Sequence, residues 1–209
     1  MALLHRAEIS PTKLELLAAW LPGRRWFHGP AGAEVVRVAA FRFDDPAGEV
    51  GIETMLVRAG DGPVHQVPLT YRGAPLAGAD GWLVGTTHHS VLGERWVYDG
   101  CGDPVYVAAL AEAILAGTGQ SAEFFEVDGE RRYREPSMTV TGTGGGGAPA
   151  VGAPRRVVDA DPALILTDTV ELVVRRRLDD EEERVGVAAL TGAWPGRATP
   201  TPLAYAVPR

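Results

Sequence analysis

Between residues 34 and 98, short β-like segments alternate with turns, and no helical segment separates them. The segments are rich in Val, Ile, Thr and aromatic residues, which favour strands. The turns are built from Asp, Gly and Pro, as at Asp80-Gly81 and Asp99-Gly100. Because parallel strands need long crossover connections, this spacing predicts an antiparallel meander. The predicted strands are Glu34–Phe43, Glu49–Arg58, Val64–Tyr71, Gly81–Thr87 and Arg95–Tyr98.

A helix is expected on each side of this meander in the sequence. Ser10 and Pro11 suit the N-cap and first position of the first helix, which ends at Pro22-Gly23. Asp103 and Pro104 begin the second helix, which Gly117 and Gly119 end. A helix across an antiparallel sheet gives an α+β fold. The apolar stripe of the first helix comprises Leu14, Leu17, Ala18 and Leu21.

A second, β-rich part is predicted from residue 120 onward, packed closely against residues 1–119. A low-complexity Gly-rich stretch, residues 142–154, lies within it and is predicted to be a flexible, solvated loop. The acidic run Asp179–Glu183 suits a helix N-terminus, so a helix is predicted from there to about Leu190. The predicted strands are Ala122–Val127, Ser137–Thr141, a hairpin of Ala163–Thr167 with Val170–Arg177 that closes near Asp168, and the extended segment Thr199–Val207.

The charge and composition exclude several classes of protein. The net charge is −7, and Lys13 is the only lysine among 20 basic residues, so a basic nucleic-acid surface is not expected. No apolar run approaches the ~18–20 residues that span a bilayer, and the start lacks a signal-peptide core. The single Cys101 cannot form an internal disulfide. These features predict a cytoplasmic protein that binds neither membrane nor nucleic acid.

Motifs that carry chemistry are present only in fragments. Gly142–Gly147 fits G-x-G-x-x-G, but no helix can follow it to receive phosphates, and no lysine follows Lys13. Adjacent His88 and His89 point to opposite faces of a strand, and His28 and His65 are isolated in the sequence, so no metal site is predicted. Ser90 lacks the nucleophile elbow of a hydrolase. We predict no catalytic residue, cofactor or metal.

Two charged segments remain as candidates for binding. Arg24, Arg25, Trp26 and His28 follow the first helix and form either a surface for a planar or sugar-like group or a packed corner. Of these, Trp26 is predicted to be mainly structural, while Arg24 and His28 face a partner. The run Arg175–Arg177 beside Asp179–Glu183 is either an anion site or a solvated, self-compensating turn, and the turn is favoured.

Five segments together resemble the N-terminal cap of actinobacterial maltokinases. They are Leu21–Phe27, Gln66–Arg72, Gly85–Thr87 with Val97–Asp99, and Asp103–Leu110. The resemblance implies a cystatin-like topology, a helix wrapped by an antiparallel sheet, for residues 1–119. More weakly, Ala163–Leu178 resembles the hairpin that carries the ATP-contacting lysine of the kinase-like N-lobe, and the helix predicted after it resembles that lobe's partner helix. Residues 120–209 are therefore expected to form a second, small, N-lobe-like subdomain.

Departures from the family pattern bear on function. Val173 stands where the family has its strand lysine, and Gly and Pro replace the phosphate loop in residues 142–154. The catalytic lobe that phosphoryl transfer needs has no counterpart in the sequence. The resemblance thus implies a non-catalytic accessory or regulatory protein near trehalose, maltose or glycogen metabolism. Its partner would be a sugar kinase, a trehalose or α-glucan enzyme, or an α-glucan.

Two other functions are left open by the sequence. One is half of a split sugar kinase whose catalytic lobe is a separate chain. The other is an unrelated hydrolase or binding enzyme that uses the cleft between the two halves.

Overall fold

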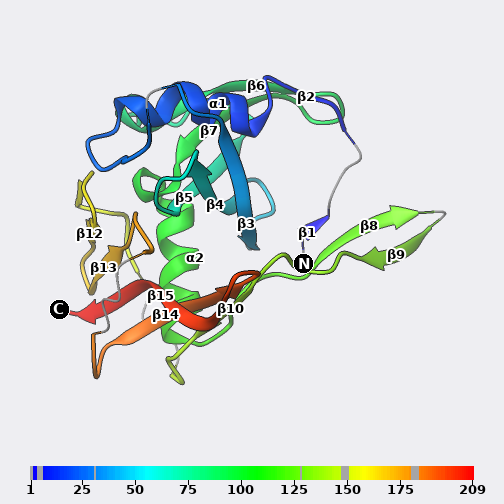
Figure 1. Ribbon diagram of the computed structural model, residues 1–209. Helices are drawn as coiled ribbons and strands as arrows, with labels where there is room; N and C mark the ends of the chain where they lie inside the picture. The colour runs from blue at the N-terminus through cyan, green and yellow to red at the C-terminus, as the bar shows by residue number, and fades with distance from the viewer. Residues whose placement is uncertain (1, 4–6, 31, 128, 147–150, 180–183) are drawn as a thin grey trace.

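The computed structural model describes residues 2–3, 7–30, 32–127, 129–146, 151–179 and 184–209. These residues form the expected α+β fold, with two six-stranded sheets, a smaller three-stranded sheet and two α-helices (Figure 1). Strand pairing is antiparallel among them except between β1 (Ala2–Leu3) and β8 (Glu123–Val127). Short 3₁₀ helices lie at Leu21–Gly23, Asp80–Trp82 and Gly100–Gly102. No helix in the described ranges has the length and apolar character needed to cross a bilayer.

The first sheet contains all five strands predicted between residues 34 and 98, in the order β2-β6-β7-β5-β4-β3. The prediction of a simple meander is wrong, because β5 pairs with β7 and β6 lies outside it. The connection of residues 73–82 is long enough to pass β6 beyond β7. The strands are β2 (Ile9–Ser10), β3 (Val35–Phe43), β4 (Gly51–Ala59), β5 (His65–Arg72), β6 (Leu83–His89) and β7 (Gly93–Asp99).

Helix α1 (Lys13–Trp20) covers one face of this sheet, above β3 and β6 (Figure 1). The prediction of Ser10 as its cap is wrong, because Ser10 belongs to β2 and Thr12 caps the helix. The Thr12 hydroxyl accepts from the Glu15 amide, and the Glu15 carboxylate accepts from the Thr12 amide, which forms a capping box. Its buried side chains are Leu16, Leu17 and Trp20, whereas Ala18 of the predicted stripe is exposed.

Helix α2 (Pro104–Leu115) begins as predicted, with the Asp103 carboxylate accepting from the Val105 amide and Pro104 in the first turn. It packs against β3 of the first sheet and against three strands of the second. One core cluster accordingly runs from Phe41 of the first sheet through Leu110 of α2 to Leu172 of the second sheet.

The second sheet has the order β10-β14-β15-β13-β12-β11. The hairpin predicted to close near Asp168 and the extended C-terminal segment are confirmed. Strand β11 carries no signal strong enough to have been predicted. The strands are β10 (Thr139–Gly142), β11 (Arg156–Val158), β12 (Ala163–Leu166), β13 (Val170–Val174), β14 (Ala188–Trp194) and β15 (Arg197–Pro208).

The prediction of a helix from Asp179 to Leu190 is wrong for those of its residues that the structure describes. Residues 180–183 lie outside the described residues, Gly186 has a φ of 79°, and β14 begins at Ala188. The segment Ala188–Trp194 is rich in helix-forming Ala, but it pairs with both β10 and β15. Tertiary pairing therefore overrides local propensity here.

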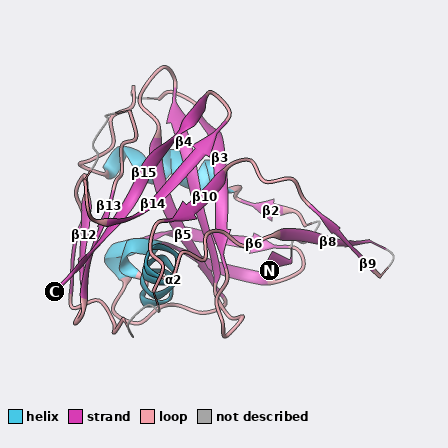
Figure 2. Ribbon diagram, turned by 90° about the horizontal axis from the view of Figure 1, so that it is seen from below, coloured by secondary structure: helices cyan, strands magenta, loops and turns pink. Residues whose placement is uncertain are grey.

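A hairpin of β8 (Glu123–Val127) and β9 (Glu130–Tyr133), which we call the arm, projects from the body in both ribbon views (Figures 1 and 2). Strand β1 (Ala2–Leu3) pairs with β8 in parallel. Strand β8 was predicted. Strand β9 was not, because all four of its residues are exposed and it lacks an apolar alternation.

Candidate functional site

The segment after α1 places Trp26 in the interior, with an exposed fraction of 2%. The indole Nε1 donates to Asp159 Oδ1 at 2.6 Å. Arg24, which was predicted to face a partner, stacks over the Trp20 ring at 4.9 Å and lies 3.7 Å from Asp159 Oδ2. Both residues therefore join the segment after α1 to the second half of the chain.

Arg25 and His28 are the exposed members of the predicted surface. The His28 ring nitrogen Nδ1 contacts the Trp26 carbonyl at 2.9 Å. The His28 amide donates to His65 Nε2 at 3.1 Å, so two histidines treated as isolated in the sequence lie together. An imidazole nitrogen that accepts a hydrogen bond must be unprotonated, so His65 is neutral here. Burial is the largest cause that lowers the pKa of His65 to about 4, and neighbouring His28 adds to it.

The side chain of Arg176 is fully buried, which contradicts the prediction of a solvated turn at Arg175–Arg177. Its Nη2 donates to Asp99 Oδ2 at 2.5 Å, and Asp99 is fully buried too. The guanidinium lies 4.5 Å from the centre of the Trp26 ring. Arg175 is 3% exposed. The run therefore forms an internal junction between the two halves; its acidic neighbours 180–183 lie outside the described residues.

Backbone hydrogen bonds extend this junction along the start of β5, where β7 does not pair with it. The Gln66 amide donates to the Arg176 carbonyl at 2.7 Å, and the Leu178 amide donates to the Val64 carbonyl at 3.0 Å. The Gln66 side chain donates to the carbonyls of Arg175 and Leu203, at 2.9 and 3.0 Å. The two large sheets are thus connected by hydrogen bonds as well as by their shared core.

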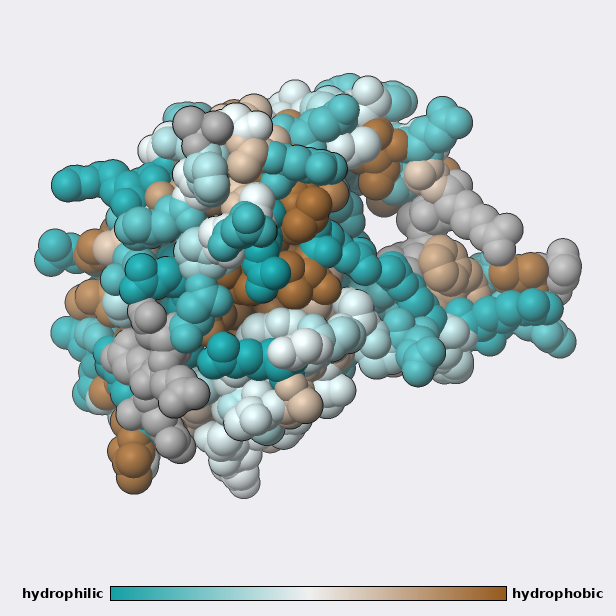
Figure 3. All heavy atoms as spheres, viewed as in Figure 1, coloured by the Kyte–Doolittle hydropathy of each residue, from teal (hydrophilic) through white to brown (hydrophobic). Residues whose placement is uncertain are grey.

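A pocket of about 530 Å³ opens between the start of α1, the tip of the β6-β7 hairpin and the arm. The space-filling view shows the molecule hollowed beside the arm (Figure 3). The pocket lies at the N-terminal end of α1, where charged side chains of β3, β4 and β7 gather: Arg37 and Arg42, Glu53, and Arg95.

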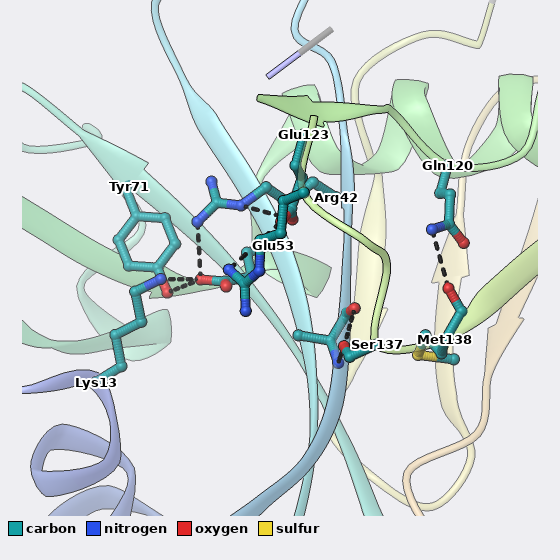
Figure 4. Close-up of polar contacts among 10 residues, drawn as sticks. Lys13, Arg42, Glu53, Tyr71, Gln120, Glu123, Ser137 and Met138 are labelled. Carbon is teal, nitrogen blue, oxygen red and sulfur yellow. Dashed lines mark hydrogen bonds and ion pairs between the residues drawn. The ribbon is translucent and has the colours of Figure 1, made fainter. Parts of the chain in front are cut away.

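Glu53 of β4 lies at the centre of this charged group, with an exposed fraction of 5%. Its Oε2 accepts from Lys13 Nζ and from the Tyr71 hydroxyl, at 2.8 Å for the latter, and lies 3.3 Å from Arg42 Nη2 (Figure 4). Burial raises the pKa of Glu53, but Arg42 and Lys13 outweigh it and hold the pKa at about 2. Glu53 is therefore a fixed carboxylate and not a proton acceptor for catalysis.

Glu123 of the arm contacts the charged group around Glu53 from the opposite side. Arg42 Nε lies 3.3 Å from Glu123 Oε1, and Arg134 Nη1 lies 3.5 Å from Glu123 Oε2. Arg37 and Arg95 also line the pocket. Burial lowers the pKa of Lys13, Glu53 opposes this, and Arg42 and Arg37 lower the pKa further.

Sequence reasoning missed this pocket, although two signals pointed to it. Lys13 is the only lysine, and Glu53 is a charged residue in the mostly apolar strand Gly51–Ala59. Of the residues examined as catalytic candidates, His88 is exposed and lies 3.3 Å from Glu94, while His89 lines the pocket. The Ser90 hydroxyl accepts from the Glu8 amide. The described residues contain no group of side chains arranged to hold a metal ion.

The Gly-rich stretch is packed where it begins, which corrects the prediction of a solvated loop there. Gly142 is buried in β10, and the Gly144 amide donates to the Ile114 carbonyl at 2.9 Å. A Cβ at Gly142 would collide with the Ala113 carbonyl oxygen, and one at Gly144 with that of Leu115. These glycines therefore permit close contact with the end of α2. Residues 147–150 lie outside the described residues.

The described residues define an α+β protein with two antiparallel sheets, a buried ion-pair junction and an open charged pocket. Residues 20–103 match the sequence model of the maltokinase N-terminal cap domain family. The match begins at the last residue of α1 and ends at the N-cap of α2, so it covers β3 to β7. The resemblance noted in the first half of the sequence is thereby confirmed. A comparison with curated proteins found no match.

The junction predicts a large effect of Arg176→Met. The substitution leaves Asp99 buried without its cation, and such a loss costs about 3–5 kcal/mol of unfolding free energy. Adding Asp99→Asn should recover part of the loss, because the buried charge is then gone. Urea unfolding measures all variants, with Arg25→Met as a control expected within about 0.5 kcal/mol of the parent. An Arg176→Met cost no larger than that of Arg25→Met would contradict the junction.

Acid should destabilise the protein in two stages. His65 has a folded pKa of about 4, below its ordinary 6.5, so its contribution is complete above pH 6.5 and is lost as the pH falls toward 4. At about 1.4 kcal/mol per pH unit, the loss reaches up to about 3 kcal/mol. Glu53, with a folded pKa of about 2 against an ordinary 4.5, adds a further loss below pH 4.5.

Unfolding free energies measured from pH 7 to pH 3 test this prediction. His65→Gln should flatten the upper stage between pH 6.5 and 4.5, because an amide oxygen can accept from the His28 amide without titrating. His88→Gln, which changes an exposed histidine, should leave the curve unchanged. A slope that persists in His65→Gln would assign the upper stage to other groups.

Proposed function

We propose that the chain is a non-catalytic accessory or regulatory protein related to the maltokinase cap, which acts by binding within trehalose, maltose or glycogen metabolism. Its partner is a sugar kinase, a trehalose or α-glucan enzyme, or an α-glucan. In this proposal residues 1–119 act as the cystatin-like cap, and residues 120–209 are a degenerate kinase-like N-lobe. The protein would work in the cytoplasm.

The burial of Val173 is the observation that carries the non-catalytic part of the proposal. Val173, where the resemblance implies the family's ATP-contacting lysine, lies on β13 and is 1% exposed. It packs in a small apolar cluster with Ala189 and Tyr205. The aligned position thus contributes to packing and offers no cation to a phosphate. The tight contact of Gly142 and Gly144 with the end of α2 supports the same proposal.

The exposed pair Arg25 and His28 supports a surface for the partner near the end of α1. Trp26 and Arg24 beside them are held by Asp159, so this surface stands on a rigid base. Exposed arginine next to a fixed aromatic group is typical of residues that concentrate binding energy.

Calorimetric titration with Mg-ATP separates this proposal from a split kinase. We expect Mg-ATP to give no more heat than inorganic triphosphate, which carries similar charge without the nucleoside. The reason is that a kinase nucleotide site recognises the nucleoside as well as the phosphates. A clear preference for Mg-ATP would contradict the proposal and favour the split sugar kinase. It should then also appear as about 1.4 kcal/mol of stabilisation at a tenfold excess over Kd.

A further inference from the structure

The pocket beside the arm gathers positive charge in a chain whose net charge is −7. Its lining cations come from α1, from two strands of the first sheet and from the segment after β9. They are Lys13, Arg37, Arg42, Arg95 and Arg134. Like charges held close together repel, so gathering these cations on one concave surface costs free energy unless negative groups offset it.

Two carboxylates, the buried Glu53 and the half-buried Glu123, do not balance these cations. Glu53 forms ion pairs with Lys13 and Arg42, and Glu123 forms ion pairs with Arg42 and Arg134. Two carboxylates thus neutralise three cations, and Arg37 has no carboxylate partner within the described part of the chain. These four cations, of which Arg37 and Arg134 are exposed, therefore carry an excess of about two positive charges over Glu53 and Glu123.

The acidic residues at the rim only partly offset this excess. Asp45 is occupied by its own turn, where its carboxylate accepts from the amides of Ala47, Glu49 and Val50. Asp44 and Glu49 are exposed to solvent, which screens them. Solvent screens the exposed Arg37 and Arg134 in the same way, so the less exposed charges are Lys13, Arg42 and Arg95 against Glu53 and Glu123, an excess of about one positive charge.

Arg95 adds a further positive charge to the wall of the pocket. Its Nη2 donates to the Leu92 carbonyl at 2.8 Å. Its guanidinium has no carboxylate partner among the residues that the structure describes, so its charge is available to an anion in the pocket.

We propose that this pocket binds a small organic oxyanion with at least two negative charges, carried by phosphoryl or carboxylate groups. Arg37 supplies free donors, and Lys13, Arg42 and Arg95 supply positive charge around the ligand. Phe125 and Leu92 offer apolar contact to the body of the ligand. The volume of about 530 Å³ is that of a site for a molecule of ordinary metabolite size. This inference rests on the pocket alone and holds independently of the proposed accessory function.

Titration calorimetry at low salt, with pyrophosphate and with citrate as probes, tests the proposal. We expect at least one of them to bind, and binding to weaken as salt is raised. Tighter binding of pyrophosphate would assign the site to phosphoryl ligands, and tighter binding of citrate to carboxylates.

Two arginine variants decide whether the binding belongs to this pocket. Arg37→Ala should weaken the better probe about tenfold, as expected for one lost charge-assisted contact. Arg58→Ala changes an exposed arginine of β4 that does not line the pocket, and it should leave Kd within about twofold. Melting temperatures close to that of the parent show that both variants are folded. No heat from either probe, or equal weakening by both variants, would overturn the proposal.

Discussion

The buried ion pair between Arg176 and Asp99 links the two large sheets of this protein. Both side chains are inaccessible to solvent, so each charge depends on the other for its solvation. Asp99 ends β7 in the first sheet, and Arg176 follows β13 in the second. Burial and the Asp99 carboxylate act oppositely on Arg176, and its pKa is raised, so the guanidinium stays charged. The two sheets cannot separate without exposing this pair and the apolar core around α2.

Helix α1 determines what lies at each end of the first sheet. At its C-terminal end, the chain turns so that Trp26 stacks on Arg176 and donates to Asp159, which brings the segment after α1 into the junction. At its N-terminal end, Lys13 contacts Glu53 of β4 in the charged pocket. The two ends of α1 therefore lie at the two sites, the rigid base beside Arg25 and His28 and the charged pocket.

Local signals in the sequence were sufficient for most individual elements. Asp103 and Pro104 marked the start of α2, and the Asp-Gly turns separated the strands of the first sheet. Long-range pairing was not accessible in this way: nothing local places β7 beside β5, or makes a strand of Ala188–Trp194. The charged sites could not be predicted from the sequence either, because their residues are far apart in the chain. Arg176 contacts Asp99 across 77 residues, and Lys13 contacts Glu53 across 40.

Differential scanning calorimetry tests most directly whether the shared core and the Arg176–Asp99 pair make one cooperative unit. The structure predicts a single transition in which the calorimetric enthalpy equals the van't Hoff enthalpy. Two resolved transitions, or a calorimetric enthalpy well above the van't Hoff value, would show that the parts divided near Gly119 unfold separately. That result would contradict the role assigned to the junction.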